Sequence, residues 1–469
     1  MLVLILLSGQ LLGSGCSYVP RLLAWAEQGI EPEVNYYAAF KLGEQSAAYN
    51  LLAIAEQSSS QHWVKVLAQN EIPEARFYLA MNTESPSEKR MHLMAAGEHD
   101  YAPALFELGI HDNTPESKVH FLNAAAQLDY FPAQRALYQW HWFHEDYSSA
   151  LPWLKKVAQQ DAKEATTLAL HFWRNRNRQE ARNWLDKAAK MGSSEAEAYL
   201  HLIARYWNKS AKTQVLAVEP QQCTMQLQFV ATSLDSIKQA HQFYQTFLQD
   251  AQLAPLPICL NPPVWIEDAE FNCRSRSVNN YRIECPLHFL DKVLTPDNFT
   301  HLTIFAKQGK ANVVNGVMYL DLADKYSVFV HELAHFVGFV DEYPLSEQFA
   351  HYYCDGAQQF PNLIVVPESQ TLEDVSLEYW QGLSQDLVLS KANTCKNHSA
   401  QAYKFSAKLT FLEFHDTGYI PEVYKAIWLE RLQSRQHLRT AALDIAQSLE
   451  QVGNVPAAQK WWRRYNEWH

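Results

Sequence analysis

The chain has 469 residues, too many for one ordinary domain, so roughly two or three domains are expected. Its hydrophobic content of 48%, with 14 Trp, 23 Tyr and 22 Phe, supplies large packed cores and excludes a disordered chain. A net charge of −12 offers no basic surface for nucleic acid, so the expected partners are proteins or peptides.

The N-terminal segment is apolar and predicts an export signal. Residues 1–12 are mostly apolar and lead through Gly-Ser-Gly to Cys16. Small residues before a lone Cys resemble the lipobox of bacterial lipoproteins, whose Cys is lipidated. A cleaved secretory signal and an uncleaved anchor are the alternatives, although the run is short for a spanning helix. We therefore expect residues 1–16 to be a lipoprotein signal peptide. Cys16 would anchor the exported protein in a bacterial outer membrane, facing the periplasm or the cell surface.

Apolar positions recur with a period near 30 over residues 17–210. The small positions are Ala75, Ala104, Ala133, Ala165 and Ala196, at spacings of 29, 29, 32 and 31. Leucines recur in phase with them, at Leu93, Leu122, Leu154 and Leu185. Because small residues at fixed places let two helices approach closely, the pattern predicts an α-solenoid of helical hairpins. A non-repetitive helical bundle is the alternative. Residues 181–192 resemble the Sel1-like branch of tetratricopeptide repeats, which implies a protein partner bound by the repeats.

The composition changes after the repeats, and the periodicity predicts alternating strands and helices. Residues 223–232 alternate apolar and polar side chains as a strand does, and residues 233–249 are helical in pattern. Four prolines predict irregular structure over residues 254–263. Two further strands are expected at 301–305 and 312–321, followed by a helix at 325–338. Beyond them, helices at 438–449 and 457–468 around a Gly453-Asn454 turn predict a C-terminal hairpin over 437–469.

Six cysteines follow Cys16, and all of them lie between residues 223 and 395. They are Cys223, Cys259, Cys273, Cys285, Cys354 and Cys395. An even number of cysteines confined to one region of an exported protein predicts up to three disulfides. The pairings that we expect are Cys354–Cys395 and Cys273–Cys285; the sequence contains no Cys-x-x-Cys motif of a zinc or redox site.

The helix expected at 325–338 carries a metal-binding motif. His331 and His335 are four residues apart, so both imidazoles share one helix face, and Glu332 beside them can take a proton from a water that the metal activates. Gly338 can end the helix in the left-handed conformation, which allows Asp341 to turn back as a third ligand. Two His and one carboxylate with an open fourth position are typical of catalytic zinc. A metal-free core helix is the alternative, although the extended motif arises by chance in about one chain in ten thousand.

Residues 331–343 resemble the metallopeptidase family named for bacterial immunoglobulin-A proteases, which carries the same motif followed by Asp-Glu-Tyr. The resemblance implies a metzincin-like fold, here a zincin-like α/β domain over residues 215–436. It implies that His331, His335 and Asp341 bind Zn²⁺ and that Glu332 is the general base. Gly338, Glu342 and Tyr343 would support the ligands from around them. The edge strand of such a domain, near residues 315–320, commonly binds the backbone of the substrate.

The chain departs from metzincins after the motif. Metzincins carry a Met beneath the metal on a later turn, whereas the last Met here is Met318. Residues 416–424 are expected in that place. Tyr419 could then stabilise the developing oxyanion as a catalytic residue, or simply pack. Three further histidines, His351, His398 and His415, are rival ligands without the local spacing of the motif.

These expectations give an α+β multidomain protein: a signal peptide, an α-solenoid, a zincin-like catalytic domain and a C-terminal hairpin. The expected function is a lipid-anchored zinc metallopeptidase whose repeats recruit a protein substrate or partner. A non-catalytic scaffold lipoprotein with a vestigial zincin domain is the alternative. Another zinc hydrolase, such as an amidase acting on cell-wall peptide, is a third hypothesis.

Overall fold

The computed structural model describes residues 18–207, 223–267, 271–277, 280–384, 387–435 and 437–469. The chain divides into two compact units, Met1–Glu197 and Ala198–His469. The predicted signal peptide and Cys16 lie outside the described residues. Within the described ranges, no helix has the length and apolar character that crossing a bilayer requires.

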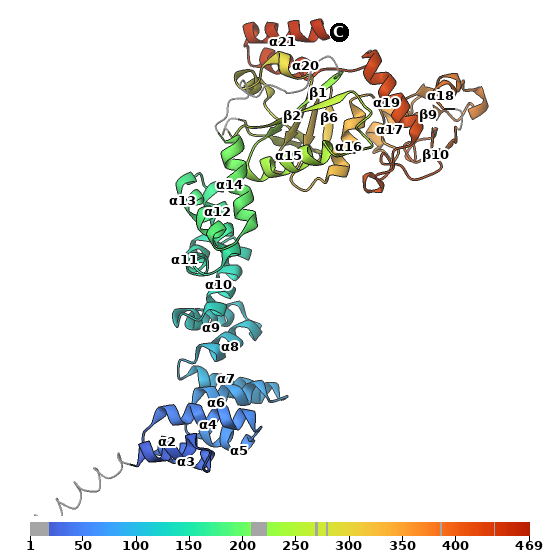
Figure 1. The fold of residues 1–469 in the computed structure, drawn as a ribbon. Coiled ribbons are helices and arrows are strands. Elements are labelled where there is room, and N and C mark those ends of the chain that lie inside the picture. The colour runs from blue at the N-terminus through green and yellow to red at the C-terminus, as the bar shows by residue number, and fades with distance from the viewer. Residues whose placement is uncertain (1–17, 208–222, 268–270, 278–279, 385–386, 436) are drawn as a thin grey trace, which may run out of the picture. The chain divides into compact units, whose positions relative to one another are not determined.

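The first unit consists of short helices joined by tight turns (Figure 1). The helices are α2 (Val19–Glu27), α3 (Pro32–Lys41), α4 (Gln45–Gln57), α5 (Gln61–Gln69), α6 (Pro73–Met81), α7 (Pro86–Gly97), α8 (Ala102–His111), α9 (Pro115–Gln127), α10 (Phe131–Phe143), α11 (Tyr147–Val157), α12 (Ala162–Arg174) and α13 (Arg178–Lys190). Helix α14 (Ser194–Tyr206) runs through the boundary between the units.

The repeating small residues lie where neighbouring helices meet. All five recurring alanines are fully buried. Gly109 on α8 shows how close this approach is, because a Cβ there would lie 2.8 Å from the Leu122 side chain of α9. The turns repeat as well: Glu71, Asp100 and Asp129, spaced by 29 residues, all adopt the left-handed conformation. The predicted solenoid of helical hairpins is therefore confirmed.

The second unit is built on a five-stranded sheet with the strand order β2-β1-β5-β7-β6. Its strands are β1 (Met225–Ala231), β2 (Ile258–Trp265), β5 (His301–Phe305), β6 (Asn312–Val314) and β7 (Val317–Leu320). The first four strands of this order run parallel, and β6 pairs antiparallel with β7 at one edge. The strands predicted at 223–232 and 301–305 are thus confirmed.

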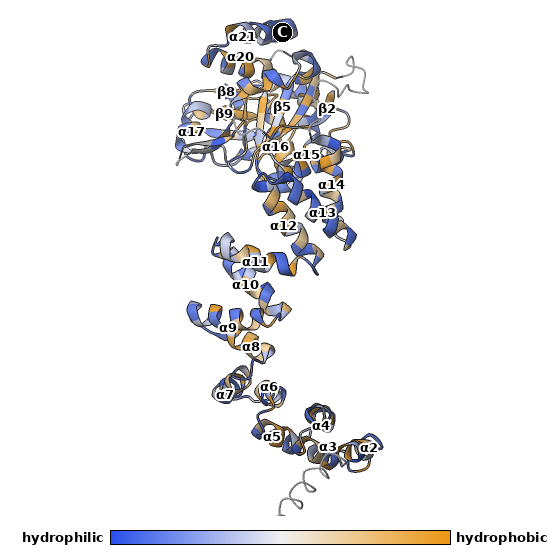
Figure 2. Ribbon diagram, turned by 90° about the vertical axis from the view of Figure 1, so that its left-hand side faces the viewer, coloured by the Kyte–Doolittle hydropathy of each residue, from blue (hydrophilic) through white to orange (hydrophobic). Residues whose placement is uncertain are grey.

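Alternate side chains of these strands build one core on each face of the sheet. On one face, Phe229 and Phe305 pack against Phe329 and Phe243, which belong to α16 (Tyr326–His335) and α15 (Leu234–Phe247). On the other face, Val230 and its neighbours contact the two C-terminal helices, α20 (Ala441–Gln451) and α21 (Val455–Trp468). The strands are correspondingly hydrophobic in Figure 2. The predicted C-terminal hairpin therefore covers the sheet.

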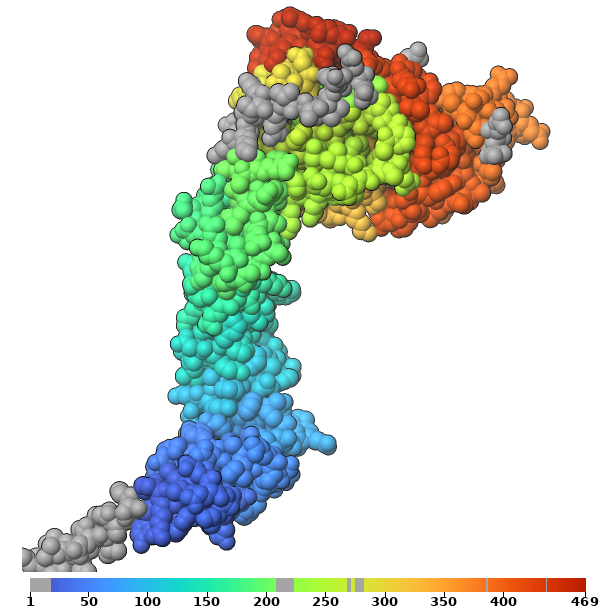
Figure 3. Space-filling view, in the orientation of Figure 1, coloured from blue at the N-terminus to red at the C-terminus, as the bar shows by residue number. Residues whose placement is uncertain are grey.

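Short elements surround this framework. They are the hairpin β3 (Arg274–Ser277) and β4 (Asn280–Glu284), the 3₁₀ helices η3 (Leu287–Lys292), η4 (Pro296–Asn298), η5 (Leu372–Asp374) and η6 (His415–Thr417), the helices α17 (Glu347–Cys354), α18 (Glu378–Leu383) and α19 (Glu422–Ser434), and the strands β8 (Gln358–Gln359), β9 (Leu363–Val366), β10 (Ser390–Ala392) and β11 (Gln401–Lys404). The last four strands form a small antiparallel sheet in the order β10-β11-β9-β8. In Figure 3 the C-terminal helices (red) adjoin the η3 region (yellow), where Ser448 accepts a hydrogen bond from the His288 backbone.

Two expected elements are wrong. Residues 258–265 form a strand although they contain Pro262 and Pro263, because β2 is an edge strand and its register with β1 shifts at these two prolines. Residues 312–321 are not one strand but a hairpin that turns at Asn315-Gly316, with Asn315 in the left-handed conformation. The edge strand is consequently β6, and residues 317–320, which were expected at the edge, lie inside the sheet.

Three disulfides tie the second unit together. Cys273–Cys285 and Cys354–Cys395 form as predicted, and Cys223–Cys259 completes the set by joining the start of β1 to β2. All six predicted cysteines are thus paired.

Candidate metal centre

Three side chains converge at the end of helix α16. His331 and His335 lie one turn apart, and the helix ends at His335. Gly338 has a φ of 85°, so the chain reverses there and returns Asp341 to the histidines. Asp341 Oδ1 lies 3.0 Å from His331 Nε2 and 3.2 Å from His335 Nε2, and the two Nε2 atoms are 3.3 Å apart. The structure therefore brings the three predicted ligands together.

The hydrogen bond that Nδ1 of each imidazole makes determines whether its Nε2 atom can bind a metal ion. His331 Nδ1 donates to the Phe411 carbonyl at 2.9 Å, and His335 Nδ1 donates to the Phe339 carbonyl at 2.8 Å. In the neutral tautomers, both Nε2 lone pairs then face the Asp341 carboxylate with no proton between them. Tetrahedral zinc, with ligands about 2.0–2.1 Å away, needs ligand atoms roughly 3.3 Å apart. The three atoms fit such an ion.

Electrostatics within this cluster favours a positive charge. Burial lowers the pKa of His335, but the Asp341 carboxylate outweighs burial and raises that pKa to about 9. Burial raises the pKa of Asp341, but the two imidazoles hold it well below its usual range. A carboxylate that stays ionised while buried needs a cation beside it, and either a proton on His335 or a metal ion can supply that charge.

Glu332 faces a cavity of about 460 Å³ next to the cluster. His331, Tyr343, Lys310, Asp324 and His415 also line it. Glu332 is only 8% exposed. Burial raises its pKa, and His335 and His331 oppose that shift. A carboxylate placed in a cavity beside two imidazoles can exchange a proton with a molecule bound there.

A buried network fixes the segment that carries Asp341. The Glu342 carboxylate is fully buried and accepts hydrogen bonds from the hydroxyls of Thr410 and Tyr424 and, at 3.0 Å, from the Asn362 amide. Asn362 also accepts from the Val340 N–H and donates to the Val340 carbonyl. These bonds hold the Val340 backbone and the Glu342 side chain, which lie on either side of Asp341, in place.

Tyr343 touches the cluster directly. The centres of the Tyr343 and His331 rings are 6.1 Å apart and the two rings are stacked, and the Tyr343 hydroxyl lies near enough to the Asp341 carboxylate to sense its charge. Burial, followed by the charge of Asp341, raises the pKa of Tyr343, so the phenol stays protonated and remains a donor. The resemblance implied that Gly338, Glu342 and Tyr343 support the ligands. In the structure Gly338 lies at the chain reversal, Glu342 in the buried network and Tyr343 beside His331.

The structure does not bring Tyr419 to the cluster. Its side chain is 37% exposed, its ring faces Lys408, and it is not among the residues that line the cavity. The segment beneath His331 is residues 410–412, which supplies the Phe411 carbonyl, and not residues 416–424. Residues 410–412 precede η6 in the chain and already occupy the place next to His331 that residues 416–424 were expected to fill.

The rival histidines do not join the cluster. His351, Asp355 and His398 form a second group in which metal-ligating atoms lie close together. However, His398 Nδ1 accepts the Ala400 N–H at 3.2 Å, so its neutral ring carries the proton on Nε2 and donates it to Asp355 at 3.0 Å. Because His398 Nε2 already donates a hydrogen bond, it offers no lone pair to a metal ion. His415 lines the cavity but contacts Ser327 and Asp416.

Sequence reasoning missed the residues that surround the ligands. Thr410, Phe411, Asn362 and Tyr424 lie 20 to 82 residues from the atoms that they contact in the cluster and its network. Phe411 acts through its backbone carbonyl, which no side-chain motif can reveal. The one available signal was that a buried carboxylate such as Glu342 needs donors from elsewhere in the chain.

Two solved structures are similar to part of the chain. A Sel1 repeat protein from Oxalobacter formigenes is 19% identical and matches 37% of this chain and 87% of its own, with a TM-score of 0.30. A protective antigen present in uropathogenic Escherichia coli strains, displaying an SLR fold, is 18% identical and matches 37% of this chain and 44% of its own, also with a TM-score of 0.30. At this TM-score neither similarity extends to activity or partners. No family model and no curated protein matches the chain.

Proposed function

We propose that the chain is a zinc-dependent metallopeptidase. The observation that carries the proposal is the triangle of His331 Nε2, His335 Nε2 and Asp341 Oδ1, with sides of 3.0, 3.2 and 3.3 Å. Both imidazoles are oriented by carbonyls on their Nδ1 side, as metal-ligating histidines usually are. The absence of that arrangement from the group around His398 supports the choice of site.

Each residue of the site has its own role in this proposal. His331, His335 and Asp341 would hold the ion, and Tyr343 would fix the Asp341 carboxylate. When bound, zinc supplies Lewis acidity, which polarises a carbonyl and lowers the pKa of water toward 7. Glu332 would take the proton of the attacking water and deliver it to the nitrogen of the leaving amine. Burial raises the pKa of Glu332, which makes its carboxylate a stronger base and favours the first of these transfers.

Zinc content and cleavage of a general peptide library test the proposal. The full-length chain should bind one zinc and cleave the library, and Glu332→Ala should keep the zinc and lose the cleavage. One bound zinc without Glu332-dependent cleavage would instead favour a non-catalytic scaffold, to which the helical repeats of the first unit are suited. Cleavage of cell-wall peptides alone would favour an amidase.

We propose also that the protein is exported and lipid-anchored through Cys16, and that its Sel1-like repeats bind a protein partner. Three disulfides in one unit support export, because such bonds persist in oxidising compartments. Metabolic labelling with a palmitate analogue tests the anchor: label should appear on the wild-type chain and be absent from Cys16→Ser.

A further inference from the structure

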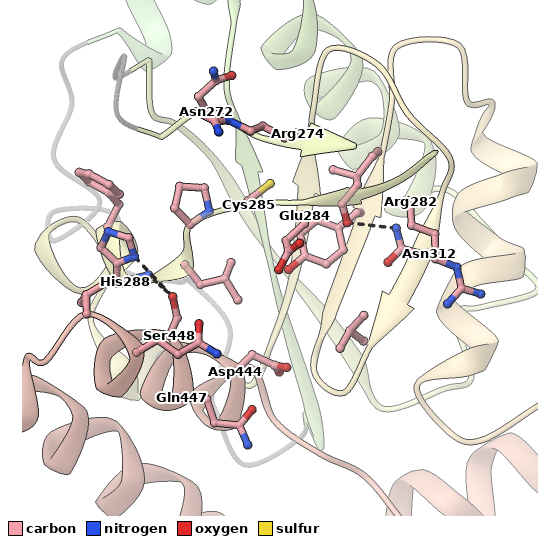
Figure 4. A pocket seen from close by; sticks show the side chains of 18 residues that line it. Asn272, Arg274, Arg282, Glu284, Cys285, His288, Asn312, Asp444, Gln447 and Ser448 are labelled. Carbon is pink, nitrogen blue, oxygen red and sulfur yellow. Dashed lines mark hydrogen bonds between the residues drawn. The ribbon is translucent and has the colours of Figure 1, made fainter. Parts of the chain in front are cut away.

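A second cavity of about 670 Å³ lies between the edge strand β6, the β3–β4 hairpin, η3 and α20 (Figure 4). None of the residues that line it also lines the cavity beside the metal centre. The Cys273–Cys285 disulfide closes the β3–β4 hairpin and fixes that wall, and at one end His288 and Ser448 hydrogen-bond each other. Gln451 at the rim is exposed, so the cavity is open to solvent.

Asp444 brings a buried carboxylate to this cavity. It lies in the first turn of α20 and is only 8% exposed. Its Oδ1 accepts a hydrogen bond from the Asn315 amide at 2.8 Å, and its Oδ2 accepts one from the Gly316 N–H at 3.1 Å. A carboxylate has room for about four such bonds, so each oxygen can accept another. Within the described part of the chain Asp444 forms no ion pair: the charge of Arg439 reaches it, but the Arg439 guanidinium donates to Asn315.

The other charged side chains of the cavity do not neutralise Asp444. Arg274 and Glu284 are directly opposite each other in the β3–β4 register, where opposite charges attract. The Arg282 guanidinium lies over the Phe349 ring, 4.5 Å from its centre, and Phe349 does not line the cavity. Among the described residues of the cavity, Asp444 is therefore the carboxylate without a cation beside it.

Much of the remaining lining is apolar. Leu287 and Phe289 belong to η3, while Val314 and Val452 are 44% and 53% exposed. Burying an ionised carboxylate costs free energy, which a cation bound beside it offsets. Apolar walls next to such a group favour a ligand that carries an apolar body, and the volume lies within the roughly 300–1,000 Å³ of ordinary ligand sites.

We propose that this cavity binds an organic ligand with an ammonium group on an apolar body, and that Asp444 accepts hydrogen bonds from the ammonium. The N-terminus of a peptide and a free alkylamine share this chemistry. Hydrogen bonds from an ammonium to a carboxylate are charge-assisted and about twice as strong as neutral ones. The inference goes beyond the proposed peptidase function and does not depend on it, because the two cavities share no lining residue.

Saturation-transfer NMR titrations of the full-length chain near neutral pH test the inference with two matched pairs of ligands. One pair is leucyl-phenylalanine amide and its N-acetylated form, and the other is hexylamine and hexanol. We expect the ammonium form of at least one pair to bind at least about 10-fold tighter than its neutral partner, because the neutral partner lacks the charge-assisted hydrogen bond. The pair that shows the difference identifies the source of the ammonium. Equal or absent binding within both pairs would overturn the inference.

Substitutions then assign the difference to Asp444. Asp444→Asn should abolish it, and Glu284→Gln, which removes a carboxylate from the same cavity, is the matched control and should keep it. Because Asp444→Asn also disturbs the bonds to the Asn315-Gly316 turn, a second variant leaves Asp444 in place. Val314→Lys brings an ammonium of the protein itself into the cavity from an exposed position on the edge strand, and it should abolish the difference too, whereas Val314→Gln should keep it. A difference that persists in Asp444→Asn or Val314→Lys, or that is lost in Glu284→Gln, would overturn the inference.

Discussion

At the scale of single residues, the tautomer of each histidine distinguishes a metal site from an ordinary hydrogen bond. The part of the chain that the structure describes contains two clusters of two histidines and one aspartate. At His331 and His335 the Nδ1 atoms donate to carbonyls, so the Nε2 lone pairs are available. At His398, Nδ1 accepts a backbone N–H and Nε2 is a donor. The two clusters therefore have opposite chemistry although their composition is the same.

This difference predicts the effects of substitutions on zinc affinity. Asp341→Ala removes a ligand and should weaken zinc binding by about 100-fold or more. Tyr343→Phe removes only the hydroxyl near the Asp341 carboxylate and should weaken binding by about 10-fold. His398→Ala is the matched control and should change nothing. Competition with a fluorescent chelator measures all three. Equal losses in the three variants would mean that zinc does not discriminate between the clusters.

Asp444 gives the folded protein a pH dependence of its own. It is 8% exposed on α20 and accepts hydrogen bonds from the Asn315 amide at 2.8 Å and the Gly316 N–H at 3.1 Å. Burial raises its pKa from 3.8 to about 6, and these two bonds only partly oppose that shift. The folded state therefore holds the proton more tightly than the unfolded chain does. The resulting stability is present below about pH 4 and is lost as the pH rises through about 6.

Urea unfolding of the wild type and Asp444→Asn at pH 5 and pH 7 measures this effect. The wild type should lose roughly 1 kcal/mol of unfolding free energy relative to the variant between these pH values. The comparison of two pH values in each protein cancels any constant cost of the substitution. Parallel pH profiles would show that Asp444 titrates alike in the folded and unfolded chains.

At the scale of elements, the local sequence pattern was sufficient to predict β1 and the helices of the solenoid. The alternating apolar residues of β1 and the repeating alanines of the solenoid predict their own burial, because each period has one structural solution. The prolines of β2 led to the wrong prediction of irregular structure, because the sequence does not show that this strand lies at an edge. The Asn315-Gly316 turn did have a local signal: Asn-Gly between apolar runs is typical of a hairpin.

The same turn packs directly against the backbone at the start of the C-terminal hairpin. A Cβ on Gly316 would lie 2.0 Å from the Ala441 nitrogen and 2.2 Å from the Thr440 carbonyl carbon. Ala441 is itself held by its N–H bond to the Thr300 carbonyl at 2.8 Å, so the clash cannot relax through a side chain. Sequence reasoning predicted the hairpin itself but could not reveal this contact, because it joins segments more than 120 residues apart.

Gly316→Ala should therefore destabilise the second unit by roughly 3 kcal/mol or more, through overpacking against main-chain atoms. Gly382→Ala on α18 is the matched control, because a Cβ there meets no heavy atom within 4 Å. Its effect should stay within about 1 kcal/mol. Denaturant unfolding followed by tryptophan fluorescence measures both. A small effect of Gly316→Ala would mean that α20 moves away from the turn without cost.

At the scale of the whole molecule, the two units differ in what stabilises them. The first unit is held by packing between neighbouring helices, whereas the second contains all three disulfides. The linked cysteines are separated by 36, 12 and 41 residues. Closing loops of this size stabilises a fold by about 3–4 kcal/mol each, so the three together are comparable to the stability of a whole domain.

Reduction should therefore act on one unit only. In calorimetry without reductant, we expect two transitions, because a repeat unit and a sheet unit with separate cores unfold independently. With dithiothreitol, one transition should fall by more than about 10 °C and the other should not move. Gly316→Ala identifies the sensitive transition, since it lies in the second unit and should lower that same transition without reductant. If reduction lowered both transitions together, the repeats would depend on the second unit for their stability, and the division into independently folded units would be wrong.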